Sequence, residues 1–109
     1  MCVASRAVVT CDTATPTVTG TANSDFLLGT EGDDVIFGLG GSDYIDGRGG
    51  NDLLCGGTGN DHITGGLGDD RLEGGTGSDF LDGGGGTNTN DGGAGWDFCI
   101  NPVDGVSCP

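Results

Sequence analysis

A strict nine-residue repeat limits the folds that are open to this chain. From Gly20 onward the sequence divides, without insertion or deletion, into nine units: GTANSDFLL, GTEGDDVIF, GLGGSDYID, GRGGNDLLC, GGTGNDHIT, GGLGDDRLE, GGTGSDFLD, GGGGTNTND and GGAGWDFCI. The first position is always Gly, and the fourth is Gly in every unit but the first, which has Asn23. The sixth position is Asp and the eighth is apolar or Cys, except in the eighth unit, which has Asn88 and Asn90. A fixed period of this kind is typical of proteins that stack copies of one small structural unit.

The repeat organises the chain as a single domain. With 109 residues the chain has room for one domain. We expect the repeat at 20–100 to lie between an N-terminal cap segment with degenerate strands, 1–19, and a C-terminal tail, 101–109. The 26 Gly residues and the net charge of −14 would by themselves favour disorder. Order is expected instead, because a strict nine-residue frame has no use in a random coil.

Each unit combines a flexible half with a stiffer half. Positions one to six are rich in Gly and polar residues and predict a turn, whereas positions seven to nine, such as FLL, VIF and YID, predict a three-residue strand. In such a strand the middle side chain faces opposite to its neighbours, so the eighth position points inward. Two units then make one turn of a flattened right-handed coil, in which each unit stacks on the next but one, about 4.8 Å away.

The consecutive nonapeptides resemble the RTX, or haemolysin-type, calcium-binding repeat family. The resemblance covers residues 20–100 and implies an all-β fold, a right-handed parallel β-roll, or β-solenoid. It also implies that calcium binds in the turns. The residues that match the acidic position of the motif in good copies of it are Asp34, Asp43, Asp52, Asp61, Asp70 and Asp79. Asp25 and Asp97 occupy the same position in the end units, and the neutral Asn88 is expected to be a weak metal position.

Electrostatics independently favours a metal in the turns. Stacking places the sixth-position side chains in two ladders, one with Asp25, Asp43, Asp61, Asp79 and Asp97, the other with Asp34, Asp52, Asp70 and Asn88. Like charges about 5 Å apart repel by a few kcal/mol at an effective dielectric of about 20. A hard dication between rungs reverses this repulsion and prefers carboxylate and carbonyl oxygens. The frame has four gaps on one edge and three on the other, so we expect Ca²⁺, up to about seven ions.

Other ions and other function classes fit less well. Zinc is disfavoured because the single histidine, His62, has no Cys or second His at ligand spacing, and magnesium demands a stricter octahedral geometry. Three Arg against 17 acidic residues argue against a nucleic-acid partner. No apolar run has the length of a membrane span, and the first residues do not form a convincing signal peptide. We see no catalytic constellation and expect no enzyme activity.

The five cysteines indicate an oxidising compartment, so we expect the protein to be secreted or to lie at the cell surface. Cys99 and Cys108 close a short loop after the last repeat and are expected to form a disulfide that latches this end. For the remaining three we favour Cys11 with Cys55, because residues 17–19 form a degenerate strand two rungs from Cys55. Cys2 with Cys11 is the rival pairing, and free thiols are a further alternative.

Two classes of function remain. The first is a non-catalytic, calcium-dependent folding or assembly module, alone or within a larger host protein. The second is ligand binding by a repetitive face, as in an ice-binding or adhesin-like module, although Thr58 has only Thr76 and Gly40 as neighbours on its edge. Outward-facing seventh positions on one sheet form an aromatic stripe, consisting of Phe26, Tyr44, His62, Phe80 and Phe98. This stripe either stabilises its own ladder or is a contact face for self-association or for the N-terminal segment.

Overall fold

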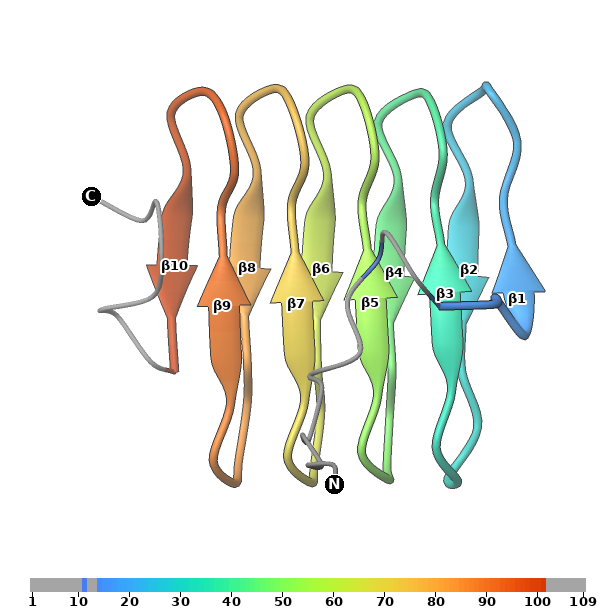
Figure 1. Cartoon of the computed structure of the whole chain (residues 1–109), viewed down its shortest axis with the longest axis vertical. Helices are drawn as coiled ribbons and strands as arrows, with labels where there is room; N and C mark the ends of the chain where they lie inside the picture. The colour runs from blue at the N-terminus through green and yellow to red at the C-terminus, as the bar shows by residue number, and fades with distance from the viewer. Residues whose placement is uncertain (1–10, 12–13, 102–109) are drawn as a thin grey trace, which may run out of the picture.

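The computed structural model describes residue 11 and residues 14–101, and within them it consists of short strands and turns without helices. The strands are β1 (Val18–Thr19), β2 (Phe26–Leu28), β3 (Val35–Phe37), β4 (Tyr44–Asp46), β5 (Leu53–Cys55), β6 (His62–Thr64), β7 (Arg71–Glu73), β8 (Phe80–Asp82), β9 (Thr89–Asp91) and β10 (Phe98–Ile100). They form two five-stranded sheets, ordered β1-β3-β5-β7-β9 and β10-β8-β6-β4-β2. The two sheets face each other and are joined by turns at both ends of the strands (Figure 1).

The register of the sheets follows the repeat. Every pairing is parallel and joins residues 18 apart, as in Phe26 with Tyr44 and Ile36 with Leu54. Each strand therefore pairs with the strand two units further on, and two units complete one turn of the coil. The predicted all-β parallel roll is confirmed.

The eighth-position side chains fill the space between the sheets. Six apolar ones are completely buried: Ile36, Ile45, Leu54, Ile63, Leu72 and Leu81. Cys99 is also buried, and Val18 and Leu27 pack against this core at its other end. Asn90 takes the core position on β9, the last strand of its sheet, and its Nδ2 donates to the carbonyl oxygen of Ile100 at 2.9 Å. A polar side chain thus closes the core where the stack of that sheet ends.

The turns depend on glycine at the second and fourth positions. In units three to nine these positions have positive φ, for example 90° at Gly57 and 95° at Gly59. A Cβ atom at Gly59 would collide with the carbonyl oxygen of Gly41 in the stacked turn. Glycine is therefore required at the fourth position both by backbone conformation and by the close approach of successive turns. Leu39 and Arg48 adopt the same positive φ at second positions in spite of their side chains.

The N-terminal segment is attached to the sheet that contains β5. The β1 strand pairs with β3, so the parallel roll begins at Val18, shortly before the repeat frame. A disulfide joins Cys11 to Cys55, with their Cα atoms 6.0 Å apart, and is the favoured one of the pairings that the sequence left open. Leu53, at an outward seventh position on the same strand, is only 7% exposed. The disulfide predicted between Cys99 and Cys108 stays a prediction, because Cys108 lies outside the described residues.

Among the residues described, no helix has the length and apolar character that crossing a membrane would require.

Candidate metal centre

The sixth-position aspartates line the inner side of the turns in two ladders. Those of units two to seven and nine are each at most 6% exposed: Asp34, Asp43, Asp52, Asp61, Asp70, Asp79 and Asp97. In each ladder the backbone N–H of one residue donates to Oδ1 of the residue two units on, for example Asp61 to Asp79 at 2.7 Å and Asp52 to Asp70 at 2.8 Å. The chain of bonds runs from Asp25 to Asp97 on one edge and from Asp34 to Asn88 on the other. The structure thus brings together the residues that the sequence selected.

The second carboxylate oxygen has a different environment. Oδ2 is buried and has no hydrogen-bond partner among the described residues in Asp43, Asp52, Asp61, Asp70, Asp79 and Asp97. A buried acceptor without a donor costs about 1–3 kcal/mol, and more when it carries charge. A bound cation would compensate such buried acceptors.

In units three to seven the orphaned oxygen lies close to the first-position glycine of its own unit. A Cβ atom built on Gly38 would lie 2.6 Å from Asp43 Oδ2 and 2.7 Å from the carbonyl oxygen of Gly56, two units on. The same pair of oxygens, from the unit's own aspartate and from the next rung, recurs beside Gly47, Gly56, Gly65 and Gly74. Glycine at position one therefore keeps open a cradle lined by oxygen atoms from two rungs.

Oxygen atoms of this kind fit a hard cation. Among the described residues, no three His, Cys, Asp or Glu side chains converge on one point. A metal in the cradle would therefore combine few carboxylates with backbone carbonyls, which suits Ca²⁺ and does not suit zinc. His62 lies away from the turns, in a strand, with its ring stacked between those of Tyr44 and Phe80.

Burial also affects protonation of the ladders. Desolvation raises the pKa of Asp52 and Asp79 to about 7 and that of Asp61 and Asp70 to about 6, from an ordinary value of 3.8. Repulsion from neighbouring carboxylates adds to the increase at Asp52 and Asp79, while backbone hydrogen bonds oppose it. The pKa of Asp43 and of Asp97 is raised for the same leading reason. Without metal, the folded roll therefore favours protonated ladders.

The pH dependence of the metal-free chain follows from these raised pKa values. Between about pH 4 and pH 7 the folded state binds more protons than the unfolded state, so its stability falls as the pH rises through this window. In metal-depleted buffer we expect more strand content at pH 5 than at pH 8, as measured by circular dichroism. Calcium-induced folding should show the opposite pH dependence. The calcium concentration at the folding midpoint should be higher at pH 5 than at pH 8, because protons compete with calcium for the carboxylates. Equal strand content at both pH values without metal would contradict this explanation.

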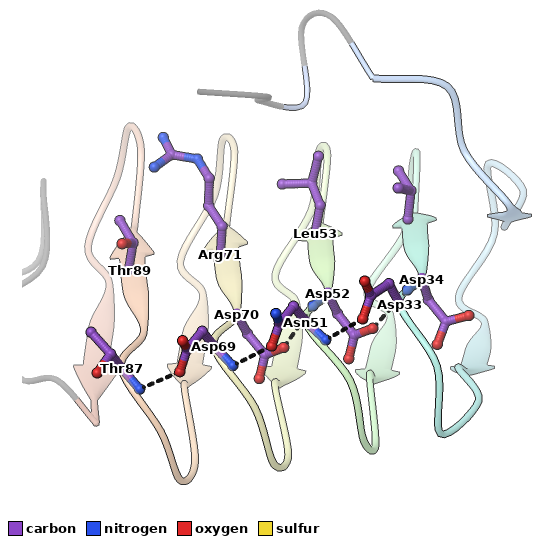
Figure 2. Close-up of a pocket in the computed structure, with 11 residues that line it drawn as sticks. Asp33, Asp34, Asn51, Asp52, Leu53, Asp69, Asp70, Arg71, Thr87 and Thr89 are labelled. Atoms are coloured by element: carbon purple, nitrogen blue, oxygen red, sulfur yellow. Dashed lines mark hydrogen bonds between the residues drawn. The ribbon is translucent and has the colours of Figure 1, made fainter. Parts of the chain in front are cut away.

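A second ladder runs outside the first, at the fifth position of the repeat (Figure 2). The N–H of Asn51 donates to Asp33 Oδ1 at 2.7 Å, and that of Asp69 donates to Asn51 Oδ1 at 2.8 Å. The N–H of Thr87 continues the series to Asp69 at 2.9 Å. The outer and inner ladders of this edge line a groove of about 410 Å³.

The role of the fifth position was not predicted from the sequence. The signal was present, because the fifth residue is short and polar in eight of the nine units, Trp96 being the exception. On the other edge Ser78 donates its N–H to Asn60 Oδ1 at 2.8 Å, and Ser42 to Ser24 Oγ at 3.1 Å. These side chains join successive turns in addition to the inner aspartate ladder, so we assign them a structural role.

The aromatic stripe follows the outer face of the sheet that contains β2, β4, β6, β8 and β10. Successive ring centroids are 4.7 to 5.2 Å apart along Phe26, Tyr44, His62, Phe80 and Phe98. Phe26 and Phe98 at the two ends are largely exposed. The N-terminal segment is bonded through Cys11 to β5 of the opposite sheet. Its attachment therefore lies away from the stripe.

The comparison with known proteins gives one match. The sequence model of the RTX calcium-binding nonapeptide repeat matches residues 19–54 and 56–89, in four copies. These ranges contain the sixth-position aspartates of units one to seven, all of which except Asp25 are buried. No curated protein and no solved structure matches the chain.

Proposed function

Because the chain belongs to the RTX calcium-binding nonapeptide-repeat family, and therefore binds calcium, we propose that it is a non-catalytic module that folds when it meets extracellular calcium. The observation that carries the proposal is the set of buried, unpartnered Oδ2 atoms, five of which lie close to a carbonyl oxygen from the next rung. Calcium, when bound, supplies the positive charge that these opposed acceptors lack.

The residues of two rungs would hold each ion. In the turn of unit five, Asp61 would contribute Oδ2 and Gly74 its carbonyl oxygen, while Oδ1 of Asp61 stays bonded to the N–H of Asp43 at 2.8 Å. The carboxylate thus has two functions, since one oxygen fixes the rung and the other faces the ion. Equivalent pairs of oxygen ligands occur in the turns of Asp43, Asp52, Asp70 and Asp79.

The proposed location is outside the cell, by secretion or at a surface. Calcium is abundant there and scarce in the cytosol, so sites of modest affinity suffice to switch folding. The disulfide between Cys11 and Cys55 supports the same location, since such bonds persist in oxidising compartments. We expect the affinity to lie near the 10⁻⁴–10⁻³ M that is common in extracellular modules. A calcium titration followed by circular dichroism tests the proposal, and cooperative folding in this concentration range would support it.

Self-association through the aromatic stripe is a second candidate function. Its support is the unbroken series of rings, exposed at Phe26, Tyr44, His62 and Phe98 and half-buried at Phe80, on the sheet opposite to the Cys11–Cys55 disulfide, since contiguous apolar surface on a soluble protein often marks an interaction site. Changing Tyr44 and Phe80 together to Thr should leave calcium-induced folding nearly intact and abolish association in analytical ultracentrifugation. Because stacked rings contribute only about 0.5–1.5 kcal/mol per pair, the double variant should still fold. A wild-type protein that stays monomeric at high concentration would contradict this function.

Ice binding or adhesin-like binding by a repetitive face has weaker support. The stacked turns align Thr58 with Thr76 and with Gly40, so this ladder has only two threonines. Trp96 and Leu67 also project from turns into solvent and interrupt a regular polar surface.

A further inference from the structure

We infer that the roll has five complete calcium sites, and that its end turns are closed by protein hydrogen-bond donors in the place of ions. This inference rests on the proposed calcium binding and deepens it. Six sixth-position aspartates have an Oδ2 without a hydrogen-bond partner. The other three sixth-position residues have no such oxygen: Asp25, Asp34 and Asn88.

At the N-terminal end, threonine supplies the missing donors. Thr30 donates its N–H to Asp34 Oδ2 at 2.7 Å, and its hydroxyl lies 3.2 Å from the same oxygen. Thr21 contacts Asp25 Oδ2 in the same way, at 2.6 Å from N and 3.0 Å from Oγ1. These residues occupy the second position, where units three to nine have positive φ and the threonines do not. The different turn conformation allows the N–H to reach the carboxylate, so no cation is needed.

At the C-terminal end, an amide replaces the carboxylate. Asn88 keeps the ladder bond, because its Oδ1 accepts the N–H of Asp70 at 2.8 Å. Its Nδ2 lies 2.8 Å from the Cβ position of Gly83, where the other units place Oδ2. From there Nδ2 donates to the carbonyl oxygens of Gly85 at 3.1 Å and Gly84 at 3.2 Å, and to that of Asn101 at 3.3 Å.

The Asn88 contacts identify the carbonyl oxygens that converge on this point. Three belong to the unit's own turn, from Gly84, Gly85 and, at 3.5 Å, Gly86, and the fourth, from Asn101, occupies the first position of the next-but-one unit. The turns of units three to seven have the same positive φ at their second and fourth positions, so they present equivalent carbonyls. There the carbonyls meet Oδ2, which donates no hydrogen bond while the carboxylate is ionised. A turn with Asn is therefore complete without metal, whereas a turn with ionised Asp needs a cation.

The number of sites follows from these contacts. An orphaned Oδ2 and a carbonyl oxygen from the next rung occur together in the turns of Asp43, Asp52, Asp61, Asp70 and Asp79. Asp97 has the orphaned oxygen but no such carbonyl from a further rung among the described residues. Of the seven gaps expected from the frame, the two nearest the N-terminus are thus closed by threonine. Five gaps remain for calcium.

Asn88→Asp tests the inference by adding a site. The ions bound per chain would be counted by isothermal titration calorimetry and by native mass spectrometry at saturating calcium. Wild type should bind five ions, and Asn88→Asp should bind six. The matched control is Asn60→Asp, which adds the same charge at an exposed fifth position, and it should still bind five.

The outcomes separate the inference from the proposed function. A wild-type chain that binds no calcium would overturn both. A chain that binds calcium but holds seven ions would overturn the inference alone, as would equal numbers of ions in Asn88→Asp and Asn60→Asp. Circular dichroism at saturating calcium checks that the variant is folded. The inference requires Asn88→Asp to reach the strand content of wild type under these conditions. A lower strand content would contradict the inference.

Discussion

Removing calcium is expected to abolish the β-roll, not merely to weaken it. The core contains a single inward side chain per nine residues, which buries little apolar surface for the backbone that must be ordered. The metal-free fold would also bury six carboxylate oxygens that have no hydrogen-bond donor, in two ladders of like charge. We therefore expect far-UV circular dichroism in excess chelator at pH 7.5 to show a largely unfolded chain. Millimolar calcium should restore the strand signal and a cooperative thermal transition.

Magnesium is the control for this experiment. It should restore much less structure at the same concentration, because it demands octahedral geometry at shorter distances than a carbonyl-lined turn provides. Full strand content and a sharp thermal transition in chelator would show that the core and the hydrogen bonds suffice, and would refute calcium-dependent folding.

Asp61→Ala is expected to raise the calcium midpoint of folding several-fold. Asp61 lies at the centre of its ladder, where Oδ1 accepts the N–H of Asp43 and Oδ2 faces one ion. Alanine removes the ion and leaves the Asp43 N–H without its acceptor, and the unsatisfied N–H alone costs about 1–3 kcal/mol. Because the ions bind together with folding, this loss is shared among the remaining sites and appears as a shifted midpoint.

Two other substitutions show whether the ion or the side-chain contact matters. Asn88→Ala, in a turn that holds no ion, should raise the midpoint less than Asp61→Ala. Asp61→Asn should also have a smaller effect, since its amide can donate to the turn as Asn88 does, but it should bind one ion fewer. Equal midpoints for Asp61→Ala and wild type would contradict the metal role of the ladder.

The architecture was predictable because the repeat determines it. A period of nine with one inward residue per unit requires that residues 18 apart be paired, and this fixes the register of both sheets. It also fixes which acidic side chains lie in each ladder. The favoured disulfide followed from the same frame, since the degenerate strand that includes Val18 lies two rungs from β5.

The closure of individual turns was not predictable from the motif. Asp34 fits the motif as well as Asp52 does, yet only Asp34 receives donors from a threonine. The difference arises from the backbone conformation at the second position, which the residue type alone does not decide, since Leu39 and Arg48 adopt positive φ there. The asparagine at position 88 was expected to be a weak ligand, whereas its amide donates to the carbonyls that a metal would contact.

Anomalous diffraction from crystals grown in calcium tests the central claim most directly, because it locates each ion relative to the ladders. The predicted result is one calcium peak beside Oδ2 of each of Asp43, Asp52, Asp61, Asp70 and Asp79, and none in the turn of Asn88. Peaks confined to the outer groove near Asp33 and Asp69, with the inner turns empty, would contradict it.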